Sequence, residues 1–279
     1  MNFSRRLPVL CLVLFGLVGA AHWARAEAPF QPVPHQAGKD VIWLPTPQSV
    51  VDEMLSMAKV TSKDLVYDLG AGDGIIAVTA GKKYGARAIG IEFNPKMAEF
   101  ATQRAQKEGV SDKVTFINGD IFVEDFSQAT VVTMYLLPAL NLRLRPALLD
   151  MPPGTRIVSH AFSMQEWKPD QTSTAGAGTA YLWIVPAKVA GEWNITRLEG
   201  AAPGKLTLSQ SFQQVGGTLT VAGVSQPLLG AKLIADQLSF SFMGADMVMQ
   251  SITATVTAGN LSGMHTAHGT SKAVEAKRR

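Results

Sequence analysis

The feature that most constrains this sequence is a short apolar run followed by a loop with glycine at every second position. Leu65-Val66-Tyr67 reads as a buried strand, and Asp68-Leu69-Gly70-Ala71-Gly72-Asp73-Gly74 follows it. A helical pattern then runs from Ile75 to about Lys83. Glycine has no Cβ, so such a loop lets a ligand approach the backbone at the N-terminus of the helix. The segment predicts a βα unit that ends in a ligand site.

Strand-like and helix-like runs alternate from residue 41 to residue 187. The further strands are predicted at 88–91, 114–117, 130–135, 156–159 and 181–185. The further helices are predicted at 46–58, 94–108 and 142–149, the first of them capped by Thr46. This alternation predicts an α/β fold, a Rossmann-like doubly wound and mostly parallel sheet with helices on both faces. Ligand sites in such sheets lie at the carboxyl ends of the strands.

Three consecutive strands end at an acidic residue. Asp68 precedes the glycine loop, Glu92 ends the second strand, and Asp120 follows the third. Glu92 lies 22 residues past Gly70, a distance typical of a carboxylate that binds a ribose diol. Asp120 lies beside the apolar Ile121, which suits an adenine amine and ring. Any one of these acids could be a turn residue or a helix cap, but the three in order favour an adenosine-type ligand.

The loop does not fit a dinucleotide. A dinucleotide-binding loop has the pattern G-x-G-x-x-G, whereas here the sixth position is Ile75. A carboxylate at Asp68 would repel a pyrophosphate, and it would suit a ligand that carries an amino group and a sulfonium charge. S-adenosylmethionine is such a ligand. A nucleotide-dependent oxidoreductase is disfavoured by Ile75 in place of the third glycine.

These motifs resemble those of class I S-adenosylmethionine-dependent methyltransferases. The matching segments are Val66 to Gly74, Ile89-Gly90-Ile91-Glu92-Phe93-Asn94-Pro95 and Asn118-Gly119-Asp120-Ile121. The resemblance covers about residues 41–187. It is closest to a branch with Pro45-Thr46-Pro47 before the first helix and Tyr135-Leu136-Leu137-Pro138 after the fourth strand. That branch includes enzymes similar to the ATP synthase c-subunit lysine methyltransferases and many bacterial proteins without an assigned substrate.

The resemblance implies a seven-stranded sheet and S-adenosylmethionine as the cofactor. It also implies where the cofactor parts lie: the methionine moiety at Asp68 and the loop, the ribose at Glu92, the adenine at Asp120. The cofactor-binding residues implied are Thr46, Asp68, Gly70, Gly72, Gly74, Glu92, Asp120 and Ile121. The sequence departs from related families in two ways. The Asn-Pro-Pro-Tyr motif of amide and base N-methyltransferases is absent, and the C-terminal region has no counterpart in the lysine methyltransferases.

Tyr135 and His160 are the candidate catalytic residues, because they end the fourth and fifth strands, where an acceptor would enter. Either could orient the acceptor or accept a proton. The alternatives are a packed aromatic at Tyr135 and a hydrogen-bonded strand-end histidine at His160. His265 and His268 lie three apart without neighbouring carboxylates, so no metal site is expected.

Residues 188–270 have the period-two pattern of short antiparallel strands, and they predict a small all-β sandwich or barrel of about six to eight strands. Trp193 and Phe212 are candidate core anchors, and Gly216-Gly217 and Gly259-Asn260 are candidate hairpin turns. Residues 271–279 read as a basic tail. The β region is either a stabilising appendage or a docking module for the acceptor.

Residues 1–26 have the three parts of a secretory signal peptide: Arg5-Arg6, an apolar run over 7–21, and Ala24-Arg25-Ala26 at the cleavage site. We expect export, with a periplasmic protein beginning at Glu27 and a linker over 27–40. An uncleaved membrane anchor and a twin-arginine signal are the alternatives. The one cysteine, Cys11, lies within the signal.

Charge and composition narrow the function. Residues 1–26 hold three arginines and no acidic residue, so the remaining chain has equal numbers of acidic and basic residues. No nucleic-acid partner is therefore expected. The function predicted is methyl transfer from S-adenosylmethionine to an unknown acceptor, a protein lysine, a lipid or a small molecule. The alternative is an exported, non-catalytic protein that retains the adenosyl pocket.

Overall fold

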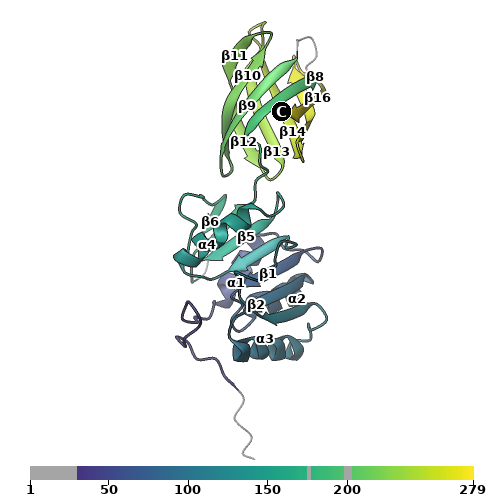
Figure 1. The fold of residues 1–279 in the computed structure, drawn as a ribbon. Helices are drawn as coiled ribbons and strands as arrows, with labels where there is room; N and C mark the ends of the chain where they lie inside the picture. Colours follow the sequence, from purple (N-terminus) through teal and green to yellow (C-terminus); the bar gives the residue numbers. More distant parts are fainter. Residues whose placement is uncertain (1–29, 175–176, 198–202) are drawn as a thin grey trace, which may run out of the picture. The chain divides into compact units, whose positions relative to one another are not determined.

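The computed structural model describes residues 30–174, 177–197 and 203–279, which form two β-sheets (Figure 1). The expected signal peptide, residues 1–26, lies outside the described residues. Within the described part of the chain, no helix is long and apolar enough to cross a membrane.

The first sheet has seven strands in the order β3-β2-β1-β4-β5-β7-β6. Its strands are β1 Leu65–Leu69, β2 Arg87–Glu92, β3 Val114–Asn118, β4 Val131–Met134, β5 Arg156–His160, β6 Gln171–Ser173 and β7 Ala180–Ile184. β1 to β5 pair in parallel, and β7 runs antiparallel to both β5 and β6. The predicted mostly parallel α/β sheet is confirmed. The sequence did not indicate β6, because this three-residue edge strand has no apolar side chain.

The described residues contain four helices. α1 Gln48–Met57 precedes β1, and α2 Ile75–Tyr84, α3 Pro95–Lys107 and α4 Pro138–Leu149 connect strands of this sheet. The Asn94 side chain caps α3 by accepting hydrogen bonds from the backbone amides of Lys96 and Met97. The expected cap of α1 is different: Pro47 occupies the N-cap position, and no side chain caps this helix.

Neighbouring residues on each strand point to opposite faces of the sheet, and helices cover both faces. On β1, Val66 packs in a core with side chains of α1 and α2, whereas Tyr67 packs in a second core with α4. Asp68 is two residues from Val66 and therefore faces the α1 and α2 side. This alternation fixes which side chains reach the carboxyl edge of the sheet on each face.

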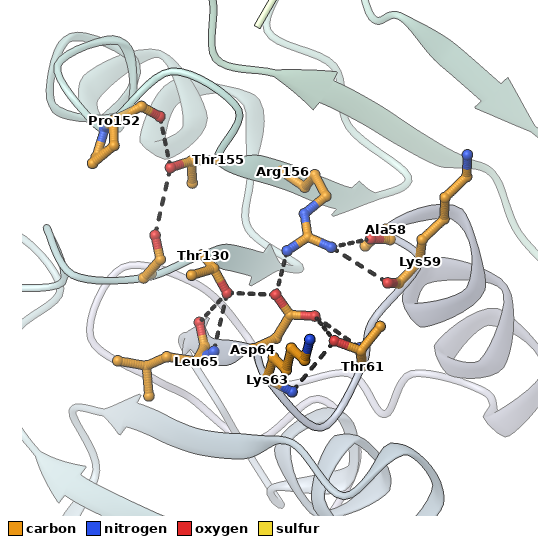
Figure 2. A network of polar contacts seen from close by, with 11 residues as sticks. Ala58, Lys59, Thr61, Lys63, Asp64, Leu65, Thr130, Pro152, Thr155 and Arg156 are labelled. Atoms are coloured by element: carbon orange, nitrogen blue, oxygen red, sulfur yellow. Dashed lines mark hydrogen bonds and ion pairs between the residues drawn. The ribbon is translucent and has the colours of Figure 1, made fainter. Parts of the chain in front are cut away.

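A polar network ties the opposite, amino-terminal edge of the sheet together (Figure 2). Arg156 on β5 forms an ion pair with Asp64, just before β1, and donates a hydrogen bond to the carbonyl of Ala58. Thr130 donates to the same carboxylate at 2.7 Å, and the Thr61 amide donates to its other oxygen at 2.7 Å. Burial alone would raise the pKa of Asp64, but these hydrogen bonds, above all that of Arg156, hold it below its usual value of 3.8.

The second sheet is antiparallel and has nine strands in the order β11-β10-β9-β8-β16-β15-β14-β13-β12. Its strands are β8 Gly191–Arg197, β9 Gly204–Ser211, β10 Gln214–Val221, β11 Val224–Pro227, β12 Leu229–Ile234, β13 Gln237–Met243, β14 Met249–Thr257, β15 Asn260–Ala267 and β16 Thr270–Arg278. The Gln226 side chain exchanges two hydrogen bonds with the Met243 backbone, so β11 and β13 meet and nearly close the sheet. The predicted all-β region is confirmed, with nine strands instead of the expected six to eight because the basic tail adds β16, and Trp193 is fully buried in its core.

Three details of this region differ from the sequence-based expectations. Gly216 and Gly217 lie inside β10 rather than in a turn. Gly217 is glycine because a Cβ there would lie 2.0 Å from the Thr207 carbonyl oxygen of the neighbouring β9. Phe212 stacks on Trp167, with ring centroids 6.1 Å apart, instead of anchoring the β core. The expected basic tail forms most of β16, whose Val274 and Ala276 point inward while the alternate residues Glu275 and Lys277 are exposed.

The network in Figure 2 predicts a large stability difference between two arginines. Arg156→Met would leave the buried Asp64 carboxylate without its charged partner, and we expect a loss of roughly 2–4 kcal/mol in unfolding free energy at pH 7. Arg87→Met, at an exposed position of β2, should change it by less than about 0.5 kcal/mol. Chemical denaturation measures both values.

The Arg156→Met effect should depend on pH in one direction. A lowered folded-state pKa stabilises the protein above the unfolded pKa, and this stabilisation is lost as the pH falls through the folded pKa. The gap between wild type and Arg156→Met should therefore narrow below about pH 4. Equal losses for the two arginine variants at pH 7 would show that the ion pair contributes no specific stability.

Candidate functional site

A cavity of about 220 Å³ opens at the carboxyl ends of the first sheet's parallel strands. The residues predicted as site residues that line it are Thr46, Asp68, Gly70, Gly72, Glu92, Asp120, Ile121 and Tyr135. Gly74 and His160 are the two predicted site residues that do not line it. The fold thus brings together the ends of β1, β2, β3 and β4 around one cavity.

The glycine loop can adopt its path only because three of its residues have no side chain. Gly70, Gly72 and Gly74 have φ values of 76°, 55° and 78°, in the left-handed region that other residues avoid. A Cβ at Gly72 would lie 2.6 Å from the Trp43 indole nitrogen, so this glycine allows the indole to pack closely against the loop. A Cβ at Gly74 would collide with Phe116, also at 2.6 Å, so Gly74 serves helix packing rather than the cavity wall.

Glu92 joins the end of β2 to the glycine loop. One of its carboxylate oxygens accepts a hydrogen bond from the Gly72 amide at 2.9 Å, and the other accepts from the Asn94 amide at 2.8 Å. Asn118 on β3 donates to the backbone carbonyls of Glu92 and Phe93, which holds this strand end in place. A carboxylate has about four acceptor positions, so Glu92 retains capacity for a diol in the cavity.

Asp68 is a buried carboxylate that is only half satisfied. It is 2 % exposed, and Thr133 donates a hydrogen bond to one oxygen at 2.7 Å. Its other oxygen has no partner among the described residues. Burial, with smaller contributions from the nearby charges of Asp73 and Glu92, raises the pKa of Asp68 to about 7 against the opposing hydrogen bond from Thr133. The site therefore suits a ligand that brings a donor or a positive charge to Asp68.

Asp120 already holds a partner from the N-terminal segment. Lys39 Nζ lies 2.6 Å from the Asp120 carboxylate and 4.8 Å from the centre of the Phe93 ring. The hydrogen bond from Lys39, together with that from the Phe122 amide, lowers the pKa of Asp120. Phe93 and Lys39 both line the cavity, and the sequence did not single out either.

The end of the expected linker is a structured part of this site. Residues 36–44, which we call the N-terminal strap, all line the cavity. The strap folds back on itself through an Ala37–Ile42 bridge and through backbone hydrogen bonds of Trp43, whose amide donates to the Gln36 carbonyl and whose carbonyl accepts from the His35 amide. The sequence pattern already places residues 41–44 in the α/β domain, so the difference from the expected linker concerns residues 36–40.

Tyr135 and His160 occupy different layers of the acceptor side. Tyr135 lines the cavity, whereas His160 is buried behind it, with the two ring centroids 4.0 Å apart. Burial lowers the pKa of His160, which favours the neutral imidazole. Its Nδ1 atom has no partner among the described residues. Of these two residues, only Tyr135 therefore reaches the cavity, and His160 packs against its ring from behind.

A family model described as the ANTKMT methyltransferase domain matches residues 68–171. A protein-lysine N-methyltransferase from Saccharolobus islandicus is 41% identical over 159 residues, which cover 55% of this chain and 96% of that protein. The human ATP synthase c-subunit lysine N-methyltransferase is 29% identical over 142 residues, which cover 50% of this chain and 60% of that protein.

Among solved structures, an RNA methyltransferase from Salinibacter ruber in complex with S-adenosylhomocysteine is similar with a TM-score of 0.51. It is 47% identical, and the match covers 52% of this chain and 96% of that one. These matches cover about half of this chain.

The half-satisfied Asp68 predicts an unusual pH dependence of stability. A carboxyl with a raised folded-state pKa destabilises the protein once it ionises, so the unfolding free energy should fall as the pH rises from about 4 to about 7. Asp68→Asn stays neutral and should escape this loss, which amounts to at most about 4 kcal/mol for a shift of about three pKa units.

Urea denaturation of both proteins between pH 4.5 and 7.5 tests this. The stability of Asp68→Asn relative to wild type should grow across that range. Parallel stability curves would mean that Asp68 is ionised, and satisfied, throughout.

Proposed function

The chain belongs to the family of S-adenosylmethionine-dependent methyltransferases that includes the protein-lysine N-methyltransferase of Saccharolobus islandicus, and we propose that its own acceptor is a lysine amine in a protein. The chain is thus a methyltransferase with S-adenosylmethionine as its cofactor. Nothing favours the alternative of a non-catalytic adenosyl-binding protein.

The observation that carries the lysine proposal is the charge of the cavity. Five acidic residues line it, against one basic residue, Lys39. The acidic residues are Asp40, Asp68, Asp73, Glu92 and Asp120. The net negative charge of the lining attracts a cationic acceptor to the cavity and repels phosphate groups, while we assign Asp68, Glu92 and Asp120 among these carboxylates to the cofactor. The Salinibacter ruber relative is named as an RNA methyltransferase, but the acidic cavity and the charge balance of residues 27–279 favour a lysine acceptor here.

The residues present fit the cofactor on two structural grounds. Asp68 offers a buried carboxylate oxygen without a described partner, and the glycine loop contributes Gly70 and Gly72, which carry no side chain, to the cavity lining. We assign Asp68 and the glycine loop to the methionine moiety, Glu92 to the ribose hydroxyls, and Asp120 with Ile121 to the adenine. Thr46 borders the same cavity and is assigned to the carboxylate end.

When bound, S-adenosylmethionine supplies a methyl group on a sulfonium, and the lone pair of the acceptor nitrogen displaces S-adenosylhomocysteine. The chain's residues must then align a neutral amine and exclude water. Apolar residues on the β4 side, among them Leu136, Leu137 and Leu140, provide a setting that favours the neutral form of a lysine. Tyr135 is placed to orient that amine.

We also propose that the protein is exported and begins at Glu27. The basic, apolar and Ala24-Arg25-Ala26 segments of residues 1–26 support this. Cell fractionation with N-terminal sequencing tests it, because an intact Met1 in the cytosol would exclude export.

Methyl transfer to lysine can be tested directly. The purified protein, S-adenosylmethionine and a synthetic peptide with one lysine should give methylated lysine in tandem mass spectra, and a peptide with arginine in its place should give none. Methylation of an RNA oligonucleotide in the same assay, without lysine methylation, would overturn the proposal.

The assignment of Glu92 predicts a large loss of cofactor affinity. A hydrogen bond to a charged group contributes roughly 1.5–3 kcal/mol, so Glu92→Gln should weaken S-adenosylhomocysteine binding by at least about tenfold. Glu99→Gln removes an exposed carboxylate of α3 and should change the affinity by less than about twofold. Isothermal titration calorimetry measures both, and an unchanged affinity in folded Glu92→Gln would refute the ribose assignment.

A further inference from the structure

The chain makes a strained turn at the point where β5 ends. The Phe162 amide donates a hydrogen bond to the His160 carbonyl at 2.8 Å, and Ala161 between them has a φ of 64°. A hydrogen bond between residues two apart across a positive φ is a γ-turn of the rare, strained kind. An alanine in this conformation persists only where its surroundings enforce it, and such strain gathers at functional sites.

Two fully buried polar side chains enforce the turn. Ser159 donates a hydrogen bond to the Phe162 carbonyl at 2.7 Å, and Asn141 on α4 donates to the same oxygen at 3.1 Å. The Ala161 amide also donates to the Thr179 carbonyl at 2.7 Å. The Asn141 side-chain oxygen has no partner among the described residues, so stability alone does not explain this residue.

The turn places Phe162 in the lining of the cavity. Its ring is nearly parallel to that of Tyr135, with an interplanar angle of 23° and centroids 6.3 Å apart. In the sheet order, β2 and β3 lie on one side of β1, and β4 and β5 lie on the other. Glu92 and Asp120 therefore occupy the cofactor side of the cavity, whereas Tyr135 and Phe162 occupy the opposite side.

We propose that Phe162 and Tyr135 form an aromatic wall that receives the acceptor lysine, and that Ser159 and Asn141 are positioning residues that hold Phe162 in this wall. The inference rests on the proposed lysine acceptor. Aromatic faces pack against the aliphatic stem of lysine and tolerate the positive charge of its methylated product. Phe162 is thus a specificity-determining residue, and Ser159 acts through it.

Steady-state methylation of the single-lysine peptide, with calorimetric titration of S-adenosylhomocysteine, separates these roles. Phe162→Leu should raise the KM for the peptide by about tenfold, with kcat changed by less than about threefold and S-adenosylhomocysteine affinity by less than about twofold. Phe162→Tyr keeps the aromatic face and should retain a KM near that of wild type. Ser159→Ala should raise the KM by about threefold, also without loss of cofactor affinity.

Phe100→Leu is the matched control, because Phe100 lies on α3 outside the cavity lining, and its KM should stay at the wild-type value. An unchanged KM in Phe162→Leu, with normal wild-type turnover, would overturn the aromatic wall alone. Loss of cofactor affinity in parallel with the rise in KM would show that Phe162 only supports the fold of the site. A wild-type protein that methylates no lysine peptide would overturn the lysine acceptor and, with it, this role of Phe162.

Discussion

The site depends on one backbone constraint, the left-handed conformation of three glycines within five residues between β1 and α2. This path turns the chain sharply at the carboxyl end of β1 and starts α2 beside the cavity. The hydrogen bond from the Gly72 amide to Glu92 then links the loop to β2. The path of the loop depends both on its three glycines and on the hydrogen bond to Glu92. The glycine loop and the proposed ribose-binding carboxylate are therefore parts of one structure.

The same edge of the sheet divides into two chemical halves. On the β2 and β3 side, carboxylates accept hydrogen bonds from backbone amides and from Lys39, and their geometry suits a polar, adenosine-containing ligand. On the β4 and β5 side, the cavity wall is apolar and aromatic. The buried Asp68 of β1 lies between these halves, and its unpartnered carboxylate oxygen is placed to interact with a positively charged ligand group such as a sulfonium. This division gives a physical reason for cofactor and acceptor to meet in one cavity.

The sequence predicted the parallel sheet and the acidic strand ends, because both rest on local periodicity and on the spacing of βα units. It did not predict the N-terminal strap, since Gly38 and the prolines before it read as a linker and only tertiary contacts reveal its role. Phe162 was missed because its placement depends on the strained turn at Ala161, which alanine does not signal. The prediction of a turn at Gly216-Gly217 was wrong, because glycine is needed there to let β9 approach closely and not to form a turn.

The most direct test of the account is native mass spectrometry of the purified protein with S-adenosylhomocysteine, for wild type and for Gly72→Ala. A Cβ at this position would collide with the Trp43 indole and would strain a positive φ. The substitution therefore distorts the glycine loop and its contact with the N-terminal strap without altering any charge. The account predicts one bound ligand per wild-type chain and a loss of most of that binding in the folded variant. A wild-type chain that binds no ligand, or a folded Gly72→Ala variant that binds as well as wild type, would contradict it.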